Sequence, residues 1–202
     1  IVSCTNDVGQ DDLEDSPFDE MVIDNPQVEM NPSGITPLSA RISLNTKVKS
    51  KVKVEIVGSP SISYTFNTLT DHHEIPIVGL FANSLNQVIV TLTDTKDRTG
   101  SKTFEIQTPA IPDYFPDITI DKSPSGPDTH FMTMVGMAIG NAGTWEVYPI
   151  AFDTEGNMRW YMDLSSYSEG NYDGRVSPIR ILKNGNLCFG GRKSSLIEMD
   201  LL

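Results

Sequence analysis

Four consecutive residues, Asp71-His72-His73-Glu74, carry two carboxylates and two imidazoles. Both kinds of group can ligate a metal ion. Adjacent residues of a β-strand point to opposite faces, so His72 and His73 would not share one ion. We therefore interpret this segment as the polar edge of a strand and predict no metal site. Asp153-Thr154-Glu155-Gly156 suggests a calcium loop, but the remaining alternating ligands and the distant Glu are missing, which favours a hairpin turn.

Two cysteines lie near opposite ends of the chain, so a disulfide scaffold is not expected. Cys188 has no histidine near it in the sequence and is interpreted as a buried strand thiol rather than a nucleophile. Cys4 follows Ile1-Val2-Ser3, which resembles the end of a bacterial lipobox. This resemblance predicts a diacylated Cys4 that anchors the protein in the cell envelope, with a free thiol as the alternative.

The glycines Gly136, Gly140 and Gly143 do not form a dinucleotide-binding fingerprint, because no strand-then-helix context with a later acidic residue accompanies them. They are interpreted as packing or turn positions. We therefore expect no cofactor.

The formal charge of −12 is concentrated at the N-terminus. Residues 1–30 contain nine acidic residues and no Lys or Arg, which leaves −3 for the rest. A polar, like-charged tract of this kind favours disorder, so residues 1–24 are predicted to be an acidic tether. The sequence contains no basic stripe that would predict nucleic-acid binding. It also contains no apolar run that approaches the roughly 18 residues of a membrane span.

Alternating apolar and polar residues predict short strands in the next region, at residues 38–44, 48–56, 87–93 and 102–106. Turns are predicted at Gly58-Ser59-Pro60, at Asn67-Thr68 and between Asp94 and Gly100. Strand signals every 10 to 15 residues without helical periodicity favour an antiparallel β-sandwich over residues 25–108.

Residues 109–128 are rich in proline, which removes amide donors, and are predicted to be a stiff linker. Further strands are expected at 130–138, 145–152, 158–163, 177–182, 187–190 and 196–201, with Asp-Thr-Glu-Gly and Lys-Asn-Gly-Asn as hairpin turns. Phe152-Asp153 and Met199-Asp200 repeat after 47 residues, within the range of about 40 to 50 for propeller blades. Residues 129–202 are therefore predicted to be the first, incomplete blade region of a β-propeller that continues beyond Leu202.

Three segments carry a resemblance to one family. The run from Asn31 to Ala40 resembles the Asn-Pro-x-Gly-x-x-Pro-Leu-x-Ala opening of the N-terminal domain of bacterial aryl-sulfate sulfotransferases. The run from Ile75 to Phe81 resembles the Pro-Ile-x-Gly-Leu-Tyr segment of that domain, and Phe152 to Trp160 resembles the hairpin Asp-Thr-Glu-Gly-x-x-Arg-Trp of the first propeller blade. The three occur in the order of the family and cover roughly residues 30–202.

The resemblance implies a small β-sandwich, a six-bladed propeller and often a homodimer. It implies transfer of a sulfuryl group from a phenolic sulfate ester to a phenol, without a nucleotide sulfate donor. A propeller histidine of the family becomes transiently sulfated, while His and Arg side chains stabilise charge. These residues come from later blades, so no catalytic residue is carried onto this sequence and the fragment alone is expected to be inactive.

Several residues of this sequence could be taken for catalytic residues, but we interpret them as structural. His130 follows the linker and matches no catalytic motif of the family. Arg159 and Arg180 could attract a sulfate, but surface or strand-pairing roles are favoured. Trp145, Trp160 and Tyr161 could stack on an aromatic substrate, but packing between blades is favoured.

The sequence therefore predicts an all-β N-terminal fragment of an envelope-bound, lipid-anchored aryl-sulfate sulfotransferase. The alternative is a non-catalytic envelope lipoprotein whose sandwich and propeller bind a glycan or a protein, because a fold does not fix a function.

Overall fold

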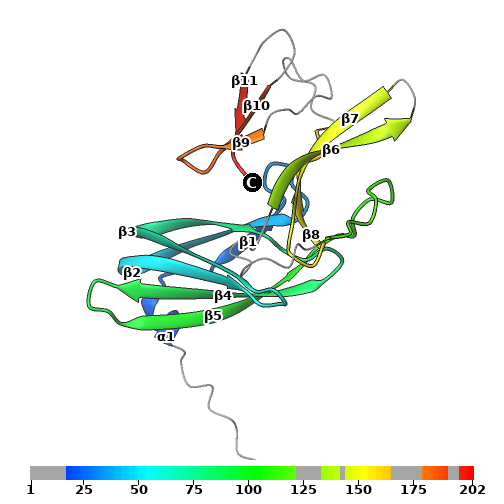
Figure 1. The fold of residues 1–202 in the computed structure, drawn as a ribbon. Helices are drawn as coiled ribbons and strands as arrows, with labels where there is room; N and C mark the ends of the chain where they lie inside the picture. The colour runs from blue at the N-terminus through cyan, green and yellow to red at the C-terminus, as the bar shows by residue number, and fades with distance from the viewer. Residues whose placement is uncertain (1–16, 122–132, 142–143, 165–178, 191–195) are drawn as a thin grey trace, which may run out of the picture.

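A computed structural model describes residues 17–121, 133–141, 144–164, 179–190 and 196–202. Within these ranges the chain is built from antiparallel strands and one short helix, which confirms the all-β prediction (Figure 1). The strands form one five-stranded sheet and two three-stranded sheets. The expectations for Cys4, His130, Gly143 and residues 122–128 of the linker lie outside the described residues.

The first sheet contains five strands, which are β1 (Gln27–Met30), β2 (Ser39–Ile56), β3 (Ile62–Val78), β4 (Leu85–Asp94) and β5 (Thr99–Gln107). β2 is the central strand. Its first half pairs with β1, its second half pairs with β4, and β3 follows it along nearly its whole length. The pairing of β2 with β3 is irregular between Asn45 and Val52, where the sheet changes its partners.

Two sequence predictions fail in this sheet. The strands expected at 38–44 and 48–56 are one strand, and the turn expected at Asn67-Thr68 lies inside β3. Lys47, Asn67 and Thr68 are exposed within continuous strands, and Thr46 is buried beside His73, so polarity at these places does not mark a chain reversal. The turn at residues 58–60 is found as predicted.

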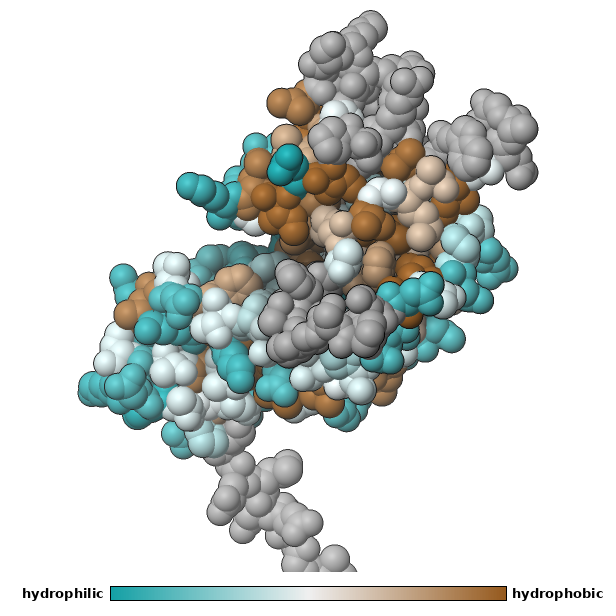
Figure 2. All heavy atoms as spheres, in the orientation of Figure 1, coloured by the Kyte–Doolittle hydropathy of each residue, from teal (hydrophilic) through white to brown (hydrophobic). Residues whose placement is uncertain are grey.

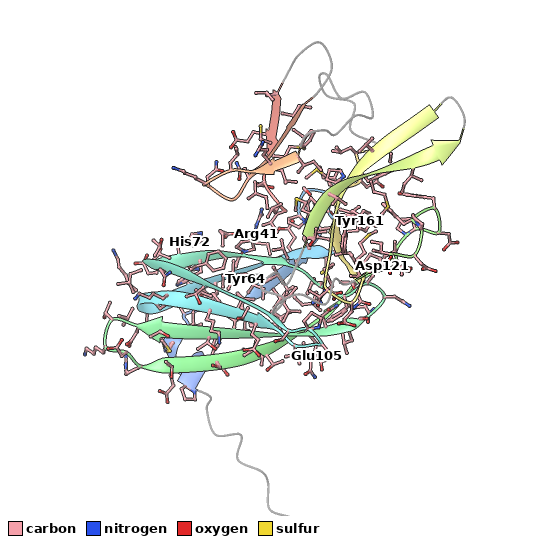
Figure 3. All side chains as sticks on the ribbon, in the orientation of Figure 1. Arg41, Tyr64, His72, Glu105, Asp121 and Tyr161 are labelled. Atoms are coloured by element: carbon pink, nitrogen blue, oxygen red, sulfur yellow. The ribbon has the colours of Figure 1, made fainter. Side chains whose placement is uncertain are left out.

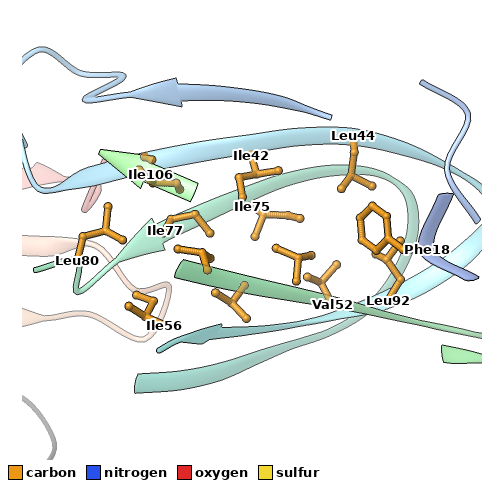
Figure 4. Packing of buried hydrophobic residues seen from close by; sticks show 14 of the residues in the cluster. Phe18, Ile42, Leu44, Val52, Ile56, Ile75, Ile77, Leu80, Leu92 and Ile106 are labelled. Atoms are coloured by element: carbon orange, nitrogen blue, oxygen red, sulfur yellow. The ribbon is translucent and has the colours of Figure 1, made fainter. Parts of the chain in front are cut away.

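The curled sheet encloses a core of aliphatic side chains and Phe18 (Figure 4). Strand β4 shows why this core forms. Its alternate residues from Asn86 to Asp94 are buried, and the residues between them are more exposed. Val88, Val90 and Leu92 are fully buried. Burying a side chain of this kind stabilises the fold by about 1.5–3 kcal/mol.

The expected tether to residue 24 requires correction, because residues 17–24 belong to the first domain. Helix α1 (Pro17–Met21) packs against β5, and Phe18 is fully buried. The backbone of Phe18 lies so close to Gly100 that a Cβ there would come within 2.5 Å of it. Val22 forms a bridge with Thr46. The acidic residues of the helix, Asp19 and Glu20, are exposed, so the acidic composition concealed a buried apolar face.

Residues 109–121 connect the first sheet to the second without forming a strand. Phe115 anchors this connection, since its ring lies 5.1 Å from the ring of Tyr148 and 5.2 Å from that of Tyr161. The linker is therefore packed onto the second part of the chain as well as being rich in proline.

The C-terminal part contains two small sheets. One contains β6 (Thr133–Asn141), β7 (Thr144–Phe152) and β8 (Met158–Tyr161), and the other contains β9 (Ile179–Ile181), β10 (Leu187–Gly190) and β11 (Leu196–Met199). A cluster that includes Trp160, Leu187 and Phe189 joins them. Figure 2 shows apolar side chains gathered over this part, whereas the surface of the first domain is mostly polar. Ile181 and Leu196 are 60% and 79% exposed.

Candidate functional site

The hairpin between β7 and β8 is organised by the carboxylate of Asp153. Its Oδ1 accepts hydrogen bonds from the backbone N–H groups of Glu155 (2.9 Å) and Asn157 (3.0 Å), and the Asn157 amide reaches both oxygens. Burial opposes ionisation, but hydrogen bonds from Arg159, Asn157 and Glu155 outweigh it and lower the pKa of Asp153. The oxygens of Asp153 are thus occupied by protein donors, which confirms the hairpin interpretation.

The same five-residue turn occurs three times among the described residues. The first residue donates to the carbonyl of the fifth, and the fourth donates to the carbonyl of the first, in residues 94–98, 153–157 and 182–186. The fourth residue has positive φ in each: Asp97 (59°), Gly156 (87°) and Gly185 (90°). The segment that starts at Asp200 begins like the turn at Asp153. Asp200 Oδ1 accepts a hydrogen bond from the N–H of Leu202 at 3.1 Å, as Asp153 Oδ1 accepts one from the N–H of Glu155. The local geometry of Asp200 thus repeats that of Asp153, as the 47-residue period suggested.

Gly156 and Gly185 provide a matched pair for mutation. A Cβ at Gly156 would come within 2.5 Å of the Ile118 carbonyl oxygen, whereas Gly185 faces open space. We expect Gly185→Ala to cost about 1–2 kcal/mol from its positive φ alone. Gly156→Ala should cost more, because it also displaces the linker. Urea unfolding of both variants measures the difference, and equal losses would show that the linker contact contributes nothing.

Arg159 lies next to this turn on strand β8 and is fully buried, so of the two predicted roles, at the surface or in strand pairing, the surface role is wrong. Its Nη1 forms an ion pair with Asp153 Oδ2 at 2.8 Å, and its Nε donates to the Gly79 carbonyl at 2.9 Å. Its Cζ lies 3.5 Å from the centroid of the Phe81 ring. Burial lowers the pKa of Arg159 while the bond and charge of Asp153 raise it. One side chain of β8 therefore binds the first domain through the Gly79 carbonyl and the face of Phe81, while its ion pair is with Asp153 of its own hairpin.

The first segment of the family resemblance, Asn31 to Ala40, lies at the same junction. Its loop is closed by Asn31, whose Oδ1 accepts from the N–H of Thr36 at 2.7 Å. The Ile35 carbonyl accepts from the N–H of Asp163 at 2.7 Å, just after β8. Leu38 is buried in a cluster with Tyr148 and Tyr161. The three segments, which are far apart in sequence, thus meet where the first domain contacts β7 and β8.

The histidines of the Asp71–Glu74 segment lie on opposite faces of β3, as the strand interpretation predicts. The His72 side chain is 65% exposed and lies 3.4 Å from Glu74, whereas His73 is buried. His73 Nε2 is 3.1 Å from Ser50 Oγ and 3.5 Å from Thr46 Oγ1. Among the described residues no group of three or more metal-binding side chains is found. His73 fills a polar position at the irregularity between β2 and β3.

His73 should make stability depend on pH. Burial and the neighbouring His72 lower its pKa below the ordinary 6.5, although Asp71 and the Thr70 backbone oppose this. In the unfolded chain His73 takes up a proton at a higher pH than in the folded chain. The free energy of unfolding should therefore fall as the pH drops from about 6.5, the pKa in the unfolded chain, to the lower pKa of His73 in the folded chain. We expect His73→Gln to flatten this slope between pH 7 and pH 5. His72→Gln removes only the smaller of the two causes that lower this pKa and should retain most of the slope in the same urea titration. An unchanged slope in His73→Gln would contradict this role.

The side chain of Trp145 lies outside the described residues, and the other remaining candidates have structural positions. Trp160 and Tyr161 are buried, and Trp160 Nε1 donates to the Leu201 carbonyl at 2.9 Å. Arg180 is exposed on β9, and Cys188 is a partly buried thiol on β10. Gly136 and Gly140 lie in β6. In the described part of the chain, no helix is long and apolar enough to span a membrane.

Two larger clefts border the junction. One, of about 750 Å³, is lined by residues that include Phe81, Asp113, Asp117 and Asn157. The other, of about 810 Å³, separates the β2–β3 surface from the C-terminal strands and includes Arg41 and Tyr64. Figure 3 shows these two residues on the sheet below β9 to β11.

Among the described residues, Arg41 is the only cation that lines either cleft, and it lies 3.5 Å from carboxylate oxygens of both Glu29 and Glu74. Its charge is therefore already compensated. No histidine lines either cleft among the described residues. Among the described lining residues, the clefts thus contain no imidazole and no cation without a carboxylate partner.

Comparison with known proteins defines the class of this architecture. A family model described as the arylsulfotransferase Ig-like domain matches residues 27–109, and one described as arylsulfotransferase (ASST) matches residues 89–202. The chain therefore belongs to the arylsulfotransferase family, as the three segments indicated. It is similar to arylsulfate sulfotransferase AssT of Lelliottia amnigena, with 26% identity over 186 residues that cover 71% of this chain and 31% of that protein. The chain thus spans about a third of the length of that relative.

The sequence alone did not single out several residues that build the junction. Asn86 and Thr108 hold Phe81 in place and belong to no recognised motif, and Gly58, which was predicted only as part of a turn, lies against the Phe81 ring. One signal was present for the repeated turn, because Asp94-Thr95 and Asp153-Thr154 begin two copies of it.

Proposed function

We propose that this chain forms the N-terminal part of an arylsulfate sulfotransferase, which transfers a sulfuryl group from a phenolic sulfate ester to a phenol. Membership of the family, matched along both halves of the chain, carries this proposal. We place the sulfated histidine and the residues that stabilise its charge in blades outside this sequence. No nucleotide sulfate donor takes part.

Two observations support this division of roles. The described clefts contain no histidine, and their one cation is paired with carboxylates. Exposed apolar residues on β9 and β11, Ile181 and Leu196, offer surface that further blades would cover. In this proposal the 202 residues provide the Ig-like domain and the first blade, and diacylated Cys4 holds the enzyme at the cell envelope.

The test follows release of p-nitrophenol from p-nitrophenyl sulfate with phenol as acceptor. The 202-residue chain should release none, and a protein that extends it to the length of the relative should turn over. Turnover by the 202 residues alone would overturn the placement of the histidine. An inactive extended protein would instead favour the non-catalytic envelope lipoprotein.

A further inference from the structure

Phe81 presents an aromatic face that the first domain fixes by itself. Its N–H donates to Asn86 Oδ1 at 2.7 Å, and its carbonyl accepts from Asn86 Nδ2 at 3.0 Å and from Thr108 Oγ1. The ring lies against Gly58, where a Cβ would come within 2.2 Å of it. Phe81 is therefore held by residues of the domain on which it lies, and Arg159 Cζ lies over its ring at 3.5 Å from the centroid.

Two carbonyl groups of the same domain border this face. Gly79 has φ of 94°, and a side chain there would come within 2.8 Å of Ile62, so glycine is required where its carbonyl meets Arg159 Nε. The Pro60 carbonyl lies 3.4 Å from Arg159 Nη1. A planar aromatic surface next to two acceptors matches a guanidinium, which stacks flat and donates in its own plane.

We propose that the Ig-like domain carries a guanidinium-binding site, built from Phe81 and the Gly79 and Pro60 carbonyls, and that Arg159 of the first blade occupies it. Asp153 contributes the opposite charge from the blade. A lysine would be a poor substitute, because a compact ammonium neither stacks on the ring nor reaches both carbonyls with fixed geometry. The site determines how the domain is held on the blade.

Chemical rescue tests this site directly. Arg159→Ala keeps Cβ and removes the atoms that ethylguanidinium contains, so this small cation should bind in their place. In the 202-residue variant, ethylguanidinium chloride at about 1–30 mM should raise the unfolding midpoint saturably, by about 3–5 °C at ten times its dissociation constant. Ethylammonium chloride at the same concentration should not raise it.

Two controls separate binding at this site from a general salt effect. The wild-type chain, whose site is occupied, and the Arg159→Ala, Phe81→Leu double variant should show no saturable rise. If Arg159→Ala does not fold, the yield of soluble chain with near-UV circular dichroism on refolding replaces the midpoint, and ethylguanidinium should increase it at least about threefold over ethylammonium. Equal effects of the two cations, or an equal rise in the double variant, would overturn the proposal.

Discussion

Arg159→Met is expected to lower the free energy of unfolding by about 3–5 kcal/mol, because it removes one partner of a buried ion pair. Asp153 would keep its charge beside the turn while losing the Nη1 contact at 2.8 Å. The Gly79 carbonyl would lose its donor as well. The loss should be measured by urea unfolding near neutral pH, where Asp153 is ionised.

Matched variants distinguish the ion pair from a general effect of removing an arginine. Arg180→Met, on the exposed strand β9, should change the free energy of unfolding by no more than about 0.5 kcal/mol. Asp153→Asn combined with Arg159→Met should cost less than Arg159→Met alone, since no buried charge is left without a partner while the Asn carbonyl still accepts from the turn N–H groups. A loss below about 1 kcal/mol in Arg159→Met would show that the pair does not hold the junction.

Phe18→Ala is expected to cost about 3–5 kcal/mol, the range for truncation of a fully buried aromatic residue. This loss corresponds to a decrease of about 6–20 °C in the unfolding midpoint for a chain of this size. The physical reason is that Phe18 closes the end of the curled sheet, where its ring lies 6.2 Å from that of Phe104. Thermal unfolding followed by circular dichroism measures it.

Ile23→Ala is the control for Phe18, because Ile23 follows the same helix but is 61% exposed. Its midpoint should change by less than about 2 °C. Deletion of residues 1–16 should also leave the midpoint unchanged, whereas deletion of residues 1–24 should lower it as Phe18→Ala does. If both deletions left it unchanged, residues 17–24 would act as part of the tether after all.

The strands and hairpins could be predicted because they depend on local patterns. Alternation from Gln87 to Thr93 gave β4 within a few residues, and the glycines at 156 and 185 indicated turns that the structure contains. The helix at residues 17–21 was missed because a short helix contributes little periodicity and the local acidity favoured disorder. Its signal was the spacing of Phe18 and Val22, four residues apart.

The junction could not be predicted because its contacts are not local. Arg159 binds Gly79, which is 80 residues earlier, and reaches Pro60 across 99 residues. An arginine after a hairpin is ordinarily expected at the surface, and only the packed structure shows that Phe81 and Asp153 accommodate its charge. The family resemblance identified the three segments but gave no indication that they touch.

A double-mutant cycle between Phe81 and Arg159 tests most directly whether the first domain and the first blade are held together through this contact. Phe81→Leu, Arg159→Met and the double variant are compared with the wild-type chain by urea unfolding. A desolvated cation stacked on a ring predicts a coupling energy of about 1–2 kcal/mol, so the double variant should lose less than the sum of the two single variants. Additive losses, within about 0.5 kcal/mol, would contradict the account.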